Sequence, residues 1–272
     1  MGTSTSLPTP SGGKWTPVKN AISDYLDNNA AVTPSTLIGG TIRAAGLAAR
    51  TPISSGSGAG GTAAATTGRG TGGGRHGGGR SGGRGSVGRT VAGLGAFGAA
   101  VRDAGMTAAL GGLGLGELRG RPAAEVVSRI AEHLVGDTTG LQGELLTAAL
   151  RDALLDAAAL AGDPSYENLE AAFQTFLERE GVEGLVELFL THYVFSRVWT
   201  LIESHVERRS ESASDATAMA SAVKGACRAH VRELVEDSVT QGQLERVNWF
   251  GREGLRLANT VVGNLEARLS AL

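Results

Sequence analysis

The sequence has few cysteines, prolines and aromatic residues, and these shortages exclude several classes of protein. Its single cysteine, Cys227, allows no intrachain disulfide and requires no oxidising compartment. The N-terminus lacks a basic segment followed by an apolar one, so no signal peptide is predicted. The most apolar long stretch, 87–116, is interrupted by Arg89, Arg102 and Asp103 and diluted by glycine, which makes it a poor membrane span. We therefore expect a cytoplasmic protein without membrane contact.

Glycine, by contrast, is abundant and concentrated in one segment. Of the 42 glycines, 16 lie among the 33 residues 56–88. A segment of this composition cannot bury enough apolar surface to offset the entropy of ordering it, so we predict a disordered Gly/Arg-rich linker over 51–88. Charge is uneven as well. Residues 1–102 carry ten basic and two acidic residues, and residues 103–272 carry 15 basic and 25 acidic residues. A basic arm on an acidic body favours an anionic partner for the arm, or attraction between the two.

Apolar residues recur at helical spacing over most of the remaining chain, and no segment shows the alternation typical of strands. Pro122 and Pro164 stand where helices are predicted to begin, and a further helix is predicted from Val182. The wide apolar faces predict an all-α fold, a helical bundle. The predicted division is an extended tail over 1–16, short helices over 17–50, the linker over 51–88 and an α-helical domain over 89–272.

No motif in the sequence is typical of catalysis. Gly93, Gly95 and Gly98 belong to GLGAFG, but the dinucleotide-binding fingerprint requires a preceding strand, so a packing or linker role is favoured. Cys227 and His230 have the spacing of two metal ligands on one helix, but zinc needs two more. We expect no enzyme activity, no metal and no cofactor. Two acidic clusters are predicted to be solvated surface charges: Glu178, Glu180, Glu183, Glu187, and Glu233, Glu236, Asp237.

The arginines of the linker offer a possible contact with nucleic acid. Such arms contact phosphates without sequence preference, but this one has no aromatic residue on which bases could stack. A solubilising linker is therefore favoured, with nucleic-acid binding as the alternative. The arginines concerned are Arg69, Arg75, Arg80, Arg84 and Arg89.

The N-terminus offers a nucleophile. Because Gly2 is small, removal of Met1 is predicted, which exposes a glycine α-amine. An α-amine has a pKa of about 8, so part of it is neutral and nucleophilic at physiological pH. The small side chains that follow, Thr3, Ser4, Thr5 and Ser6, allow the tail to enter a narrow channel. MGTSTS also matches a myristoylation pattern, although no adjacent polybasic run supplies a second membrane signal.

Several segments together resemble the QatB family, the B component of the four-protein Qat anti-phage systems of bacteria. They are MGTSTS, the Arg/Gly-rich spacer, GLGLGELRGRPAAEVVSRIAEHL (residues 112–134) and LLTAALRDALLDAAA. In those systems the partners are a QueC-like enzyme (QatC), an ATPase and a TatD-like nuclease. QueC-like enzymes use ATP to turn a 7-deazaguanine carboxylate into a nitrile, and in related defence systems such an enzyme conjugates a deazaguanine to an N-terminal glycine.

The resemblance implies a non-catalytic defence protein that is modified by its partner. Gly2 would accept the deazaguanine, Thr3 to Ser6 would form the recognised tail, and the helical body would dock the QueC-like enzyme. Residues 7–10, LPTP, stand where the family continues with glycines. The alternative is an adaptor that uses the arm from Arg69 to Arg89 to present phage nucleic acid to a nuclease.

Overall fold

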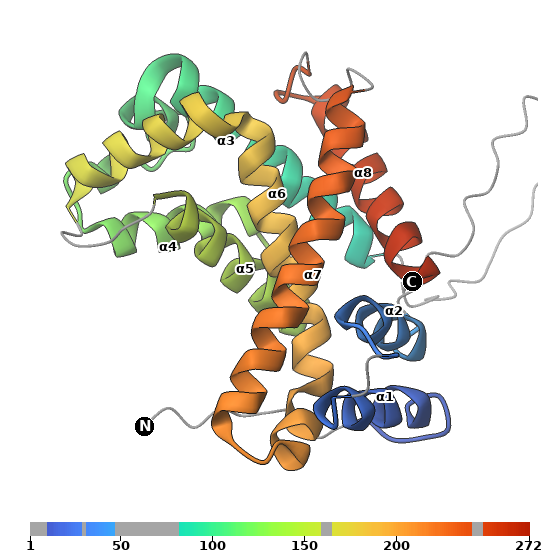
Figure 1. Ribbon diagram of the computed structural model, residues 1–272. Coiled ribbons are helices and arrows are strands. Elements are labelled where there is room, and N and C mark those ends of the chain that lie inside the picture. The colour runs from blue at the N-terminus through green and yellow to red at the C-terminus, as the bar shows by residue number, and fades with distance from the viewer. Residues whose placement is uncertain (1–9, 29–30, 47–81, 159–164, 241–246) are drawn as a thin grey trace, which may run out of the picture.

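The chain forms an all-α fold, which confirms the fold class predicted from the sequence (Figure 1). The computed structural model describes residues 10–28, 31–46, 82–158, 165–240 and 247–272. Within these ranges there are eight α-helices, one short 3-10 helix and no strand. The elements are α1 (Thr16–Leu26), α2 (Pro34–Ala44), α3 (Gly82–Gly112), η1 (Gly116–Leu118), α4 (Ala123–Val135), α5 (Gly140–Ala158), α6 (Tyr166–Arg209), α7 (Ala213–Thr240) and α8 (Arg252–Ala271).

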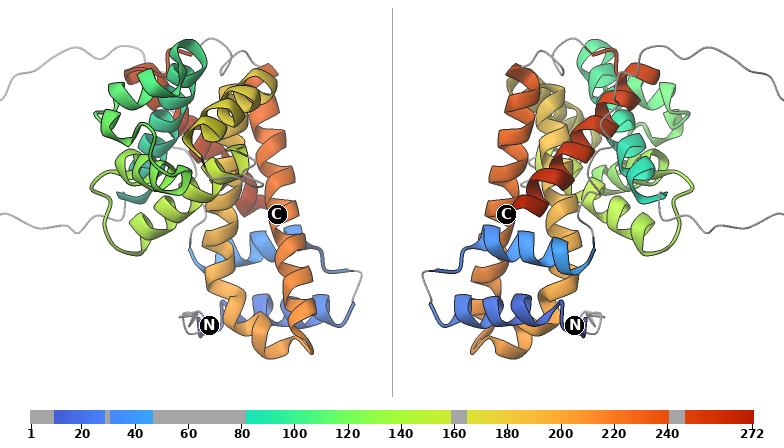
Figure 2. Two further views of the ribbon diagram at one scale, coloured as in Figure 1. Left: turned by 90° about the vertical axis from the view of Figure 1, so that its left-hand side faces the viewer. Right: turned by 90° about the vertical axis from the view of Figure 1, so that its right-hand side faces the viewer.

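The hairpin of α6 and α7 runs the length of the molecule, and the other helices gather around it (Figure 2). α3, α4 and α5 cover one end of α6, whereas α1 and α2 cross the other end of the hairpin. Apolar side chains recur along α6 and are buried from Leu169 to Val206. By length and composition α6 could span a membrane, but 56% of its most apolar window is buried inside the body, as in a core helix.

Gly181 breaks α6 into two segments. Its φ of 68° lies outside the helical region, in a conformation that glycine adopts without a steric penalty. The sequence predicted two helices here, one after Pro164 and one from Val182, and the break agrees with that division. Pro164 itself lies outside the described residues. Ser165 caps the helix, because its Oγ accepts a hydrogen bond from the backbone N–H of Asn168 at 3.3 Å.

The folded body extends further than the sequence predicted at two boundaries. The predicted linker reached residue 88, but α3 begins at Gly82 and the side chain of Val87 is buried. Glycine-rich composition misled here because small residues also let helices approach closely, and α3 packs against α8. The predicted tail reached residue 16, but Trp15 is buried in the core. Its indole removes enough apolar surface from water to hold the end of the tail against the body.

The C-terminal end of α8 packs on α2. Arg43 of α2 donates a hydrogen bond from Nη1 to the carbonyl of Ser270 at 3.0 Å. Gly39 lies against Leu272 so closely that a Cβ there would be 2.6 Å from the Leu272 carbonyl carbon. Thr33 and Thr36 form a reciprocal capping box that starts α2. The position of α2 therefore depends on a contact that only glycine allows.

We predict that Gly39→Ala destabilises the protein, whereas Gly40→Ala does not. A Cβ at Gly39 would clash with backbone, which costs about 1–3 kcal/mol in a packed core. A Cβ at Gly40 would meet only Val18 Cγ2, at 3.6 Å, and alanine favours a helix over glycine by up to about 1 kcal/mol. Thermal and urea unfolding of the two variants would check this. Equal stability of the two variants would contradict the close α2–α8 contact.

Candidate functional site

The predicted site residues divide between the described and the undescribed parts of the chain. The tail from Gly2 to Ser6 lies outside the described residues, as do Arg69, Arg75 and Arg80. Arg84 lies in the first turn of α3. Arg89 is exposed on the same helix, and its Nε donates a hydrogen bond to the Gly85 carbonyl at 3.2 Å. The structure therefore places the last two arginines of the proposed arm on a helix of the body.

The N-terminal segment joins the body at Trp15. A turn precedes it, in which the Trp15 N–H donates to the Gly12 carbonyl at 3.0 Å and Gly12 has a φ of 110°. The Trp15 carbonyl then accepts a hydrogen bond from the N–H of Lys19, which continues into α1. This arrangement fixes residues 12–19 on the body.

A groove lies beside this point, between α1 and α2, and we name it the α1–α2 groove. It has a volume of about 470 Å³. The buried side chains of Val18 and Leu37 form part of its floor, and the exposed cations Lys14 and Arg43 stand at its edge. No acidic residue is among those that line it: Lys14, Pro17, Val18, Ala21, Ala31, Val32, Thr36, Leu37, Gly40, Arg43 and Ala44. The sequence predicted short helices here but not the groove, because that depends on how they pair.

A second groove, the α5–α7 groove, has a volume of about 930 Å³ and is lined by α5, α6 and α7. Its apolar surface includes Phe176 and Leu188. Glu187, at its edge, was predicted to be a solvated surface charge, but its side chain is only 15% exposed. It pairs with Arg228 at 3.4 Å and with Arg232 at 3.1 Å, and so joins α6 to α7.

Further ion pairs connect the helices around this groove and beyond it. Asp156 of α5 accepts a short hydrogen bond from His192 of α6, with Nε2 and Oδ2 2.7 Å apart, and lies 3.9 Å from Lys224 Nζ of α7. Glu233 and Asp237 are exposed, as predicted, and both also pair with Arg268 of α8. Sequence reasoning missed these pairs because their partners lie on other helices.

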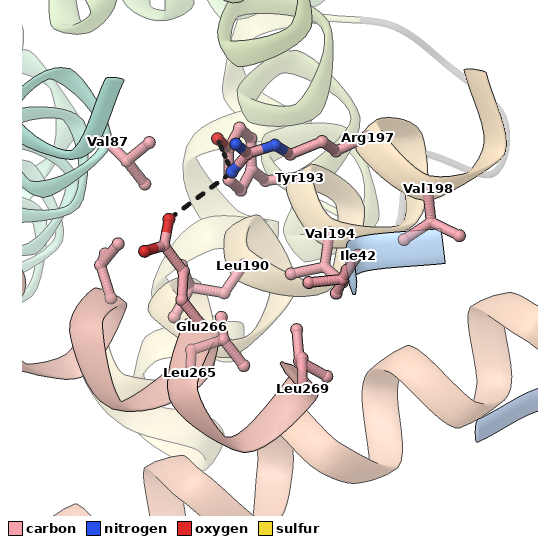
Figure 3. Close-up of a pocket in the computed structure, with 11 residues that line it drawn as sticks. Ile42, Val87, Leu190, Tyr193, Val194, Arg197, Val198, Leu265, Glu266 and Leu269 are labelled. Carbon is pink, nitrogen blue, oxygen red and sulfur yellow. Dashed lines mark hydrogen bonds and ion pairs between the residues drawn. The ribbon is translucent and has the colours of Figure 1, made fainter. Parts of the chain in front are cut away.

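A small cavity at the junction of α2, α3, α6 and α8 is shown in Figure 3. Its volume is about 30 Å³, which is room for about one water molecule and not for a cofactor. Arg197 pairs with Glu266 at 3.6 Å and donates to the Tyr193 hydroxyl at 3.0 Å. Gln142 of α5 donates to the same hydroxyl at 3.1 Å. This cluster ties α5 and α8 to α6, and its role is structural.

Two candidate motifs also have structural roles. Cys227 is fully buried, and burial raises the pKa of its thiol to about 12, which disfavours the thiolate form. His230 hydrogen-bonds through Nε2 to Ser35 Oγ of α2 at 2.9 Å. In the described ranges, no three histidine, cysteine or acidic side chains are grouped so as to hold a metal ion.

The glycines of GLGAFG lie inside α3, and in the described chain no strand precedes them. Gly95 packs on the indole ring of Trp249, and a Cβ at Gly98 would lie 2.9 Å from Leu185 Cδ1. These contacts confirm the packing role and leave no space for a phosphate.

Comparisons with known proteins gave one finding. The family model described as "QatB: Qat anti-phage system associated protein QatB" matches residues 72–258, which is more than half of the chain. No curated protein and no solved structure matches the chain. The matched range contains α3 to α7 and the start of α8, whereas α1 and α2 lie outside it.

We predict that the stability of the protein falls as the pH drops below about 6.5, which is the usual pKa of a histidine side chain. Burial lowers the pKa of His205, whose charged neighbours are Lys19, Arg208 and Arg209. Burial also lowers the pKa of His230, where Arg268 acts in the same direction and Glu233 opposes it. The unfolded chain then binds more protons than the folded one, so protonation favours unfolding.

Thermal unfolding between pH 8 and pH 5 would check this. The double variant His205→Gln/His230→Gln should show a weaker pH dependence than the native protein. His133, which is exposed on α4, provides the control, and His133→Gln should leave the dependence unchanged. If the double variant kept the pH dependence of the native protein, His205 and His230 would not be its cause.

Proposed function

The chain belongs to the QatB family of the Qat anti-phage system, and we propose that it acts there as a non-catalytic protein whose N-terminal glycine is modified by a partner enzyme. The resemblance inferred from the sequence is thereby confirmed, and with it a role in anti-phage defence. The family is described as a system-associated protein. The proposed modification is conjugation of a 7-deazaguanine to Gly2 by a QueC-like enzyme (QatC).

The observation that carries the proposal is the anchoring of the chain at Trp15, with the acceptor glycine ahead of it. Gly2 precedes Trp15 by 13 residues, a length that reaches at most about 45 Å when extended. A partner docked on the body can therefore receive the amine in an enclosed active site. The small side chains of Thr3, Ser4, Thr5 and Ser6 suit a narrow entrance.

The chemistry requires only that the tail supply a neutral amine. Its pKa of about 8 leaves a usable neutral fraction at physiological pH. The amine attacks a deazaguanine carboxylate that the enzyme has activated with ATP, an amide bond forms, and the activating group leaves with loss of one amine proton. In this proposal the ATPase and the TatD-like nuclease of the system are further partners.

Intact-protein and N-terminal-peptide mass spectrometry, after co-expression with the neighbouring QueC-like enzyme, tests the proposal. We expect a deazaguanine-sized mass increase on Gly2. Gly2→Leu should abolish the increase, because it favours retention of Met1 and blocks the glycine amine. Gly13→Leu, at an exposed glycine before α1, should leave it intact.

An unmodified N-terminus, with the enzyme shown to be active and bound, would exclude the acceptor role. The adaptor function would then be favoured, and binding to nucleic acid should fall steeply with salt.

A further inference from the structure

We propose that the α1–α2 groove is the docking site for an acidic, partly apolar segment of the enzyme that modifies the N-terminus. This inference rests on the proposed function, because it assigns the surface by which the modifying partner is held. None of the predicted site residues of the tail and linker lines the groove, and the groove lies outside the range matched by the family model.

The charge of the groove favours an acidic occupant. Lys14 and Arg43 stand at its edge and no acidic side chain lines it. Residues 103–272 carry 25 acidic against 15 basic residues, so the groove is a basic site on a chain whose helical body is mostly acidic. Carboxylates of a partner would be attracted here and repelled by much of the rest of the body.

The floor of the groove favours apolar side chains at the centre of the contact. Val18 and Leu37 are almost fully buried, and Ala21 and Val32 are partly exposed beside them. A volume of about 470 Å³ accommodates several side chains of a partner. Apolar anchors surrounded by a charged rim are the usual composition of a protein interface.

The position of the groove suits the modification of the tail. Lys14 at its edge is 12 residues from Gly2, a separation that spans at most about 40 Å. An enzyme held in the groove therefore keeps its active site within reach of the amine, and the local concentration of the amine rises accordingly. The α5–α7 groove is less suited to an acidic segment, because Arg228 and Arg232 already pair with Glu187, and Lys224 lies 3.9 Å from Asp156.

The experiment is a binding titration of the full-length protein with the purified QueC-like enzyme at physiological and low salt. We expect Lys14→Glu to weaken binding about tenfold, and Lys14→Glu/Arg43→Glu to weaken it further. Arg256→Glu makes the same change of charge at an exposed site on α8 that does not line the groove, and should leave the Kd unchanged.

Controls separate docking from folding and from tail recognition. Because Arg43 also bonds to the Ser270 carbonyl, thermal unfolding of each variant is measured, and Lys14→Glu alone must show the effect. Gly2→Leu should remain unmodified, and its loss of binding should be smaller than that of Lys14→Glu, because the tail contributes only weakly to binding.

The outcomes distinguish this inference from the proposed function. Native-like binding by Lys14→Glu and by the double variant would overturn the docking site, even if Gly2 is modified. The docking site would also be overturned if the native protein did not bind the enzyme. Groove-dependent binding with an unmodified Gly2 would support the docking site and refute the acceptor role.

Discussion

The burial of α6 is the constraint on which the rest of the structure depends, because this helix packs against α1, α2, α3, α4, α5 and α7. Each large apolar side chain that it removes from water contributes about 1.5–3 kcal/mol, whereas an exposed or partly exposed ion pair contributes about 1 kcal/mol or less. The apolar stripe along α6 therefore holds the helices together. Pairs such as Glu187 with Arg232, and Arg197 with Glu266, select the register in which they meet. The apolar stripe continues on both sides of Gly181, where the helix changes direction. Glycine adopts the positive φ of this break without strain.

The N-terminal helices depend on that framework and on the end of α8. α2 packs against α6, α7 and α8, and it is held by the Arg43–Ser270 hydrogen bond and by the close approach of Gly39 to Leu272. Both partners in this contact, α2 and residues 259–272, lie outside the range matched by the family model. The matched range therefore covers α3 to α7 and the start of α8, whereas α1, α2 and the end of α8 lie outside it. The α1–α2 groove lies among these elements, next to Trp15, because Lys14 and Pro17 are among the residues that line it.

The sequence predicted the helical class because apolar periodicity is a local property that each helix carries alone. It predicted the break near Gly181 for the same reason. It did not predict the start of α3, because a glycine count does not distinguish disorder from close helix packing, and the difference lies in partners such as Asn259 of α8, which Gly88 approaches closely. Glu187 was misjudged on similar grounds, since its arginines come from another helix. The packing role of GLGAFG was predicted correctly from the missing strand, but the surfaces it meets could be known only from the fold.

Under the proposed function, the small tail and the folded body have complementary tasks. Thr3, Ser4, Thr5 and Ser6 offer few atoms for contact, so the tail alone would bind an enzyme weakly. A docking surface on the body raises the concentration of the amine at the active site, to about the millimolar range for a short connection. Weak recognition of the tail is then sufficient, and specificity comes from the groove and its charges. The body would thus contribute to the modification without any catalytic group of its own, because holding Trp15 and the α1–α2 groove in a fixed relation already determines which chain is presented.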